Sequence, residues 1–295
     1  MADRLTVRQA LAQAGVAPID AQVLLAHVLR ADRAWLIAHA TDPLARSQVE
    51  QFFSLARQRR DGEPVAYLTG WREFWGLSLA VDRSVLIPRP ETETLVECAL
   101  RRLPADRPLR VLDLGTGSGA IALAIAQERP RTEVLATDRS AAALVVARKN
   151  AERMKLANVR WLQSDWYAEL PTGGARFELI ASNPPYVAER DAHLREGDVR
   201  FEPRTALCAG VDGLDALRII IRGARERLVE GGALVVEHGY DQADAVRDLM
   251  LGAGFSDVES LRDLAGIPRV AAARATFPTQ NTHGYIDSSS RSPIP

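Results

Sequence analysis

From residue 109 onward, short continuous apolar runs alternate with longer stretches in which apolar residues recur at helical spacing. Continuous apolar runs are typical of strands buried on both faces of a parallel sheet, and amphipathic stretches are typical of the helices that cover it. The runs lie at Arg110–Leu114, Glu133–Thr137, Val159–Gln163, Phe177–Ala181 and Ala233–Glu237, and the helical stretches lie at Ala120–Arg129, Ala141–Met154 and Leu214–Leu228. This order predicts an α/β fold with a doubly wound, mostly parallel sheet.

The pattern changes after a further helical stretch at Asp241–Ala253. Candidate strands at Asp257–Leu261 and Arg269–Ala273 are joined by a short loop through Gly266 and Pro268. Two strands joined in this way predict an antiparallel end to the sheet. The segment 277–295 is rich in Ser and Pro and is predicted to be a disordered tail.

The first part of the chain predicts a different architecture. Residues 1–70 show helical spacing, with Thr6 as a candidate N-cap, a second helix from Pro18 and a third that ends in the basic run Arg57–Arg60. Residues 71–85 are aromatic and partly alternating, which favours a β-hairpin linker. We therefore predict a helical domain (1–70), a hairpin linker (71–85) and an α/β domain (86–276).

Composition narrows the class of protein. Hydrophobic residues make up 47% and charged residues 25%, as in ordinary globular proteins, and the formal net charge is -1. A dedicated binder of duplex DNA is usually more basic, so no nucleic-acid partner is expected. Cys98 and Cys208 lack the spacing of a zinc site, and no metal is expected. No signal peptide and no apolar run of about 20 residues is visible, which predicts a cytoplasmic protein.

Residues that could bind a ligand or take part in catalysis follow the carboxyl ends of the predicted strands. In a parallel sheet these ends lie on the same side of the sheet. The first strand runs into the glycine loop Gly115-Thr116-Gly117-Ser118-Gly119, whose backbone can approach a ligand at the start of a helix. The second ends at Asp138, which can accept hydrogen bonds from ribose hydroxyls or cap the next helix. Both features suit NAD as well as S-adenosylmethionine.

The residues after the third strand favour S-adenosylmethionine. Asp165 can accept a hydrogen bond from an adenine amino group, and Trp166 offers its aromatic ring to the purine. Trp166 can equally fill the core, so both interpretations of this residue stay open here.

The most specific motif is Asn183-Pro184-Pro185-Tyr186, directly after the fourth strand. Two consecutive prolines cannot continue a strand because both lack the N–H that the ladder requires, so they hold a rigid turn with exposed carbonyls. Such a turn can accept both hydrogens of a planar –NH2 group, one at the Asn183 side-chain oxygen and one at the Pro184 carbonyl, while Tyr186 stacks on the flat substrate. An ordinary loop is the alternative interpretation.

This turn also indicates how methyl transfer from S-adenosylmethionine to the nitrogen of such an –NH2 group would be catalysed. An amide nitrogen is a poor nucleophile because its lone pair is delocalised, and the turn contains no Cys, Lys or acid that could deprotonate it. Catalysis then comes from alignment with the methyl donor and from acceptors that favour the positive charge developing on nitrogen. We predict Asn183, Pro184 and Tyr186 as catalytic residues and the whole turn, Pro185 included, as the substrate site.

The chain as a whole, to about Ala275, resembles the peptide chain release factor glutamine methyltransferases of the HemK family. The segments that carry the resemblance are Arg59–Gly70, Glu73–Leu77, Leu86–Glu93, Leu112–Gly119, Ser182–Tyr186, Glu202-Pro203 and Ala206-Leu207. The segments before Gly70 and around Pro88 are the more specific ones, since many amino-methyltransferases share the turn and the glycine loop.

The resemblance implies a class I S-adenosylmethionine-dependent methyltransferase fold, Rossmann-like, with a small helical domain that recognises the protein substrate. It implies that Gly115–Gly119, Asp138, Trp166 and Asn183 bind S-adenosylmethionine, with S-adenosyl-L-homocysteine as product, and that Asn183–Tyr186 hold the substrate glutamine. The implied substrate is the glutamine of the Gly-Gly-Gln tripeptide of class 1 release factors, methylated at N5. We expect the enzyme to be a monomer.

Other function classes fit less of the sequence. A nucleic-acid methyltransferase acting on adenine N6 or guanine N2 would meet the same –NH2 geometry, but it would need a basic and aromatic groove for the base. The sequence offers no large target-recognition insert. An NAD-dependent oxidoreductase leaves the turn unexplained, and a non-catalytic scaffold would not need it. The nucleic-acid methyltransferase is the alternative that an experiment must separate.

Overall fold

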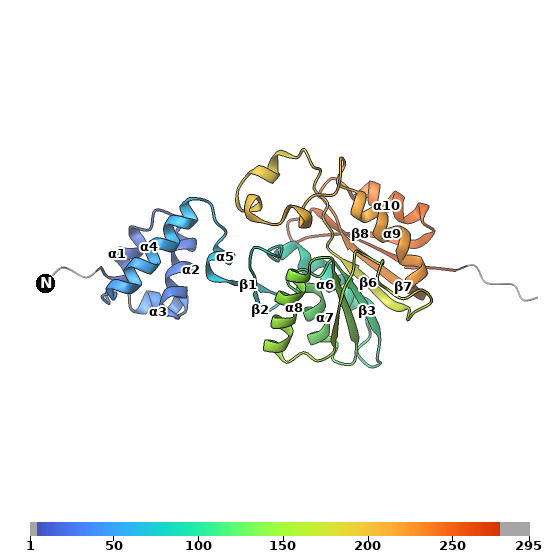
Figure 1. The fold of residues 1–295 in the computed structure, drawn as a ribbon, viewed down its shortest axis with the longest axis horizontal. Helices are drawn as coiled ribbons and strands as arrows, with labels where there is room; N and C mark the ends of the chain where they lie inside the picture. The colour runs from blue at the N-terminus through green and yellow to red at the C-terminus, as the bar shows by residue number, and fades with distance from the viewer. Residues whose placement is uncertain (1–4, 278–295) are drawn as a thin grey trace, which may run out of the picture.

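The chain begins with a cluster of helices that lies apart from the sheet in the computed structural model (Figure 1), which describes residues 5–277. The helices are α1 (Val7–Ala12), α2 (Pro18–Leu29), α3 (Arg33–Ala38), α4 (Arg46–Arg60) and α5 (Val65–Thr69). Thr6 caps α1 as predicted, since its Oγ1 accepts from the Gln9 N–H and the Gln9 side chain accepts from the Thr6 N–H. Leu24, Leu25 and Phe52 form the buried centre of the cluster.

The sequence pattern does not reveal α3 and α5. They contain six and five residues, which is less than two turns and too short for an apolar period to show. Both are nevertheless needed to close the cluster, because Leu36 of α3 is buried in it and Val65 of α5 packs against it.

A β-hairpin follows, as the aromatic segment predicts. Strands β1 (Trp71–Phe74) and β2 (Leu77–Ala80) pair antiparallel around the turn residues Trp75 and Gly76. Both turn residues have positive φ, 51° and 68°, as a two-residue type I′ turn requires.

The buried side chain of Asn150 fastens this hairpin to the α/β domain. Its Oδ1 accepts from the Ala80 N–H at 2.7 Å, and its Nδ2 donates to the carbonyls of Ala80 and Ser118, both at 3.0 Å. Asn150 therefore links the hairpin to the glycine loop.

Seven strands form one sheet in the order β5-β4-β3-β6-β7-β9-β8. They are β3 (Arg110–Leu114), β4 (Glu133–Asp138), β5 (Val159–Gln163), β6 (Phe177–Ser182), β7 (Leu228–Glu237), β8 (Phe255–Arg262) and β9 (Pro268–Ala275). Every pairing among β3 to β7 is parallel, so the predicted mostly parallel sheet is confirmed. Strand β7 begins earlier than the predicted run at Ala233, because Gly231 and Gly232 interrupt its apolar pattern.

Helices cover both faces of this sheet (Figure 1). They are α6 (Glu93–Arg102), α7 (Ala120–Glu128), α8 (Ala141–Met154), α9 (Asp215–Arg227) and α10 (Ala243–Gly252). The short helix η1 (Pro90–Thr92) precedes α6, and η2 (Ala192–Arg195), η3 (Asp198–Phe201) and η4 (Arg204–Ala206) lie in the loop between β6 and α9. Val111 of β3 belongs to the same apolar cluster as Leu95 of α6, whereas the next residue, Leu112, belongs to the cluster that contains Leu217 of α9. Successive strand residues point to opposite faces, which gives the sheet its two apolar layers. No helix within residues 5–277 is long and apolar enough to cross a membrane.

The far end of the sheet contains a reversal. Strand β9 runs antiparallel to both of its neighbours, β7 and β8. The predicted antiparallel end is therefore confirmed, although the reversed strand lies one position in from the edge. The chain leaves β9 beside the start of β7, where the Phe277 N–H donates to the Glu230 carboxylate at 2.9 Å. Of the predicted disordered tail, residues 278–295 lie outside the described residues.

Candidate active site

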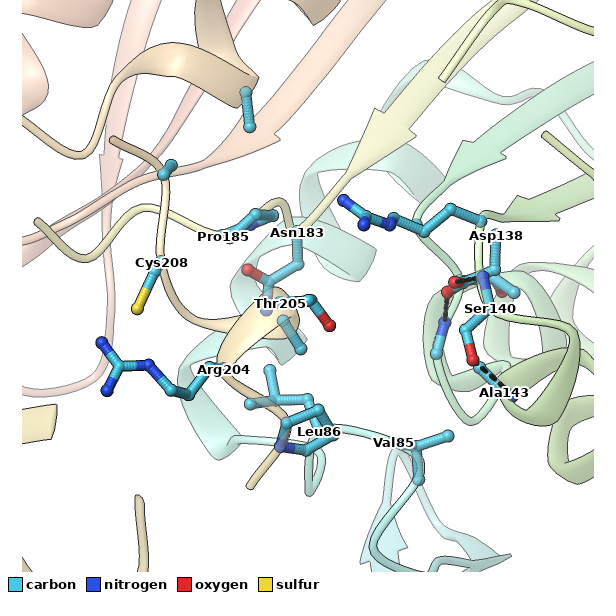
Figure 2. A pocket seen from close by; sticks show the side chains of 18 of the residues that line it. Val85, Leu86, Asp138, Ser140, Ala143, Asn183, Pro185, Arg204, Thr205 and Cys208 are labelled. Carbon is cyan, nitrogen blue, oxygen red and sulfur yellow. Dashed lines mark hydrogen bonds between the residues drawn. The ribbon is translucent and has the colours of Figure 1, made fainter. Parts of the chain in front are cut away.

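The carboxyl ends of β3, β4 and β6 border a cleft of about 900 Å³ (Figure 2). Of the residues that the sequence singles out, this cleft is lined by Gly115, Thr116, Gly117, Ser118, Asp138, Asp165, Trp166, Asn183 and Pro185. Pro184 and Tyr186 instead line a second cavity of about 160 Å³, to which Asn183 also belongs. Gly119 lines neither cavity. The structure thus brings the predicted residues, apart from Gly119, together around two adjoining cavities.

The glycine loop has a backbone that residues with side chains adopt only under strain. Gly115, Gly117 and Gly119 have φ of 72°, 56° and 86°, in the left-handed region. A Cβ at Gly119 would also lie 3.0 Å from the Leu123 side chain and 3.3 Å from that of Ala147. Gly119 therefore serves the close packing of α7 against α8, while Gly115 and Gly117 shape the wall of the cleft.

Asp138 lies across the cleft from Asn183 (Figure 2). Its Oδ2 accepts from the Gly117 N–H at 2.9 Å and its Oδ1 from the Ser140 N–H at 2.8 Å. Ser140, and not Asp138, caps α8, because the Ser140 Oγ accepts from the Ala143 N–H. Burial raises the pKa of Asp138, and the two N–H groups oppose that rise. The carboxylate thus braces the glycine loop and keeps further lone pairs for a ligand.

Asp113 is a buried carboxyl group that the sequence analysis did not single out. It lies within β3 with no exposed surface, and its Oδ2 accepts from the Thr116 hydroxyl at 2.6 Å. Its Oδ1 has no hydrogen-bond partner in the described part of the chain. Burial raises the pKa of Asp113 to about 7. A charged residue inside an otherwise apolar run is the signal that could have revealed it.

Trp166 combines the two roles that the sequence leaves open. It lines the cleft, and it also packs against the apolar layer under α9 and α10. Its φ of 52° is unusual for a large residue. A Cβ at Gly115 would come within 3.5 Å of the Trp166 ring, so the ring lies over the glycine loop.

Thr92 orients the side chain of Asn183. Asn183 Nδ2 donates to Thr92 Oγ1 at 3.0 Å. Because the amide nitrogen is engaged there, Oδ1 is the Asn183 atom left to accept a hydrogen bond from a ligand. Thr92 is buried in η1, and its role was not predicted from the sequence. The family resemblance of Leu86–Glu93 was the only signal that pointed to this segment.

Asn183 stands at the border between the two cavities. Leu86 and Ala206 also line both of them. The larger cavity has the size of a small-molecule ligand site and a polar wall at the glycine loop. The smaller cavity, next to Pro184 and Tyr186, has room for one side chain. A group that passes from a ligand in one cavity to a ligand in the other would pass beside Asn183.

One wall of the smaller cavity belongs to the loop that carries η2, η3 and η4. The buried Glu202 ties this loop to Arg89, with 2.5 Å between the charged groups. Asp198 ties it to the helical domain through Arg59 at 2.6 Å, and Arg59 also pairs with Asp20 of α2 at 2.7 Å. The loop is therefore connected both to the cavity and to the helical domain.

The stability of the protein is expected to depend on pH through Asp113. The pKa of this group is about 7 in the fold and about 3.9 in an unfolded chain. Between these values the folded protein binds more protons, so the free energy of unfolding falls as pH rises, by at most about 1.4 kcal/mol per pH unit. Asp113→Asn should flatten this decline in denaturant unfolding between about pH 4 and 7. Equal slopes for wild type and Asp113→Asn would contradict the prediction; the exposed Asp106→Asn is the control.

Both the helical part and the sheet-containing part of the chain match known protein families. Residues 5–70 match the family model described as PrmC N-terminal domain, and residues 92–198 match the one described as methyltransferase small domain. A release factor glutamine methyltransferase from Xylella fastidiosa is 54% identical over 87% of this chain and 92% of that protein. One from Bordetella pertussis is 53% identical over 90% of this chain and 97% of its own length. A methyltransferase structure from Pyrococcus furiosus covers 75% of this chain and 98% of that one, with a TM-score of 0.53 and 19% identity, and shows a shared fold.

Proposed function

The chain belongs to the family of release factor glutamine methyltransferases, and we propose that it methylates the glutamine of the Gly-Gly-Gln tripeptide of class 1 peptide chain release factors at N5. The proposed methyl donor is S-adenosylmethionine, which leaves as S-adenosyl-L-homocysteine. In this proposal the larger cavity takes the donor and the smaller one takes the glutamine side chain.

The position of Asn183 is the observation that carries the proposal. It lines both cavities, and Thr92 holds its amide so that Oδ1 can accept one hydrogen of the substrate –NH2 group. The Pro184 carbonyl would accept the second hydrogen. Bound S-adenosylmethionine would supply the methyl group from its sulfonium, which would become a neutral thioether. Positive charge would develop on the substrate nitrogen, so the Asn183 and Pro184 acceptors would gain strength before that nitrogen lost a proton to solvent.

The larger cavity suits the donor through residues of three strand ends. The glycine loop offers close backbone approach, Asp138 offers acceptors for the ribose hydroxyls, and Asp165 with Trp166 would hold the adenine. The residues that this proposal assigns to the donor are Gly115, Thr116, Gly117, Ser118, Asp138, Asp165, Trp166 and Asn183. Gly119 supports the loop by its packing.

Asp138→Ala is expected to weaken binding of S-adenosylmethionine by about 1–3 kcal/mol, because it removes acceptors for the ribose and the brace of the Gly117 N–H. Titration calorimetry with the cofactor is the measurement, and thermal unfolding shows whether the variant is folded. The exposed Asp106→Ala serves as the control. Unchanged affinity in a folded Asp138→Ala protein would remove this residue from the site.

The helical domain is the proposed recognition surface for the release factor, and a single copy of the chain is the proposed active form. The ion pair of Arg59 with Asp198 supports the first point, since it connects that domain to the loop beside the smaller cavity. A protein substrate that contacts the helices would then also meet the loop.

Methylation assays with tritiated S-adenosylmethionine test the proposed function. Release factor, transfer RNA, ribosomal RNA and DNA are offered in parallel, and mass spectrometry locates the methyl group. We expect label on the glutamine of the release factor. Label on RNA or DNA in preference to the release factor would favour the nucleic-acid methyltransferase instead.

A further inference from the structure

A buried carboxyl group lies directly behind the Asn183–Tyr186 turn. Glu237, the last residue of β7, is 1% exposed and lines neither cavity. Its Oε1 accepts a hydrogen bond from the Tyr186 hydroxyl at 3.1 Å. Its Oε2 has no hydrogen-bond partner among the described residues. Burying a carboxylate oxygen without a hydrogen-bond partner costs free energy of folding. A role of Glu237 in supporting the turn would explain why the fold keeps this group.

Thr92 is a further polar neighbour of this carboxyl group. The Thr92 hydroxyl accepts from Asn183 Nδ2 at 3.0 Å, and its proximity to Glu237 opposes the rise of the pKa of that carboxyl group. Glu237 is therefore hydrogen-bonded to Tyr186 and lies near the hydroxyl group that orients Asn183.

The backbone of the turn has a separate anchor. Gln242 Nε2 donates to the Tyr186 carbonyl at 3.1 Å, and Gln242 Oε1 accepts from the Gly239 N–H at 2.9 Å. Because this anchor does not involve Glu237, a change at Glu237 should act on the orientation of side chains and leave the path of the backbone in place.

We propose that Glu237 is a positioning residue, which holds the Tyr186 ring through its hydroxyl group in the orientation that receives the substrate amide. The proposal rests on the proposed function. Without this acceptor, the Tyr186 hydroxyl loses its hydrogen-bond partner and the ring is no longer held in one orientation.

The surroundings of Glu237 make its ionisation accessible to experiment. The charged groups that face it are Arg269 from β9 and Glu91 from η1, and Tyr186 faces it from the turn. Burial raises the pKa of Glu237 to about 7, while Thr92, Tyr186 and Arg269 oppose the rise. The acceptor of the Tyr186 hydroxyl therefore changes its charge near neutral pH.

Single-turnover methylation of the release factor tests the proposal with Glu237→Ala, Glu237→Gln, Tyr186→Phe and the double variant Tyr186→Phe/Glu237→Ala. Glu237→Ala should lower the rate at least about tenfold through lost alignment, with cofactor affinity unchanged. Glu237→Gln keeps an acceptor oxygen and should recover most of the rate. The double variant should be no slower than Glu237→Ala. Glu230→Gln, an exposed position on the same strand, is the matched control.

A second measurement does not depend on methyl transfer. Carbon-13 at Cζ of tyrosine gives an NMR signal for Tyr186, which is identified by its loss in Tyr186→Phe. This signal should shift with a midpoint near pH 7 in the wild type and should not do so in Glu237→Gln.

A wild-type rate in folded Glu237→Ala, additive losses in the double variant, or a Tyr186 signal that ignores Glu237 would each overturn the proposal. A wild-type protein that leaves the release factor unmethylated would instead refute the proposed function. The NMR result would still report whether Glu237 acts on Tyr186.

Discussion

Replacing Asn183 with alanine is expected to slow methyl transfer about 10²–10³-fold, because one of two preorganised acceptors for the developing charge is lost. The cost should fall on the chemical step, since the hydrogen bond matters most when nitrogen becomes positive. Release-factor binding should change little, because the partner is also held elsewhere. Single-turnover rates at saturating donor, together with the dissociation constant of the release factor, separate the two effects.

Thr92 provides the matched pair of controls for Asn183. Thr92→Ser keeps the hydroxyl that accepts from Asn183 Nδ2 and should react at nearly the wild-type rate. Thr92→Val keeps the shape without the hydroxyl and should lose part of the rate. If Asn183→Ala methylates glutamine at wild-type speed, the assignment of this turn is wrong.

Gly213→Ala is expected to cost about 2–5 kcal/mol of unfolding free energy, from left-handed backbone strain together with overpacking. Gly213 has a φ of 75°, and a Cβ there would lie 2.3 Å from the Tyr186 carbonyl oxygen and 2.8 Å from Gln242 Nε2. The backbone of the turn must therefore move. A displacement of about 1 Å can cost about 10²-fold in rate, so methylation should fall as well.

Gly231→Ala separates the clash from the strain. Gly231 has nearly the same φ, 73°, but a Cβ there would meet nothing within 4 Å. It should cost only about 1–2 kcal/mol and leave the methylation rate unchanged. Urea unfolding and single-turnover rates of both variants provide the comparison. Equal losses of stability and rate at the two positions would show that the contact of Gly213 with the turn is unimportant.

The part of the fold that the sequence predicts best is the part with the strongest local pattern. Strands β3 and β5 and helix α8 have the predicted bounds. Strands buried on both faces need continuous apolar runs, and a long helix shows its period several times. The convergence of Asp138 and Asn183 on one cleft was predictable for a related reason, since parallel strands end at the same edge.

The contacts that orient the site could not be read from the sequence. Thr92 lies far from Asn183 in the chain, and Asp198 lies 139 residues from its partner Arg59. No local period marks such pairs, because they form only when the sheet and the helical domain are assembled. Asp113 and Glu237 stand out as acids in apolar strands, but the pattern alone does not show which groups they contact. Their roles follow from their burial and from the hydroxyl groups that donate to them, Thr116 to Asp113 and Tyr186 to Glu237.

The reversal of β9 determines where the enzyme can be attached to other molecules. Because β9 runs antiparallel to β7, the chain reaches Phe277 beside the start of β7. Phe277 therefore lies at the amino ends of the parallel strands, whereas the cleft lies at their carboxyl ends. The helical domain, in contrast, is connected by Arg59 to the loop beside the smaller cavity. An affinity tag, a dye or an immobilising bead is therefore best placed on the C-terminal side, where it leaves the route of a large protein substrate open.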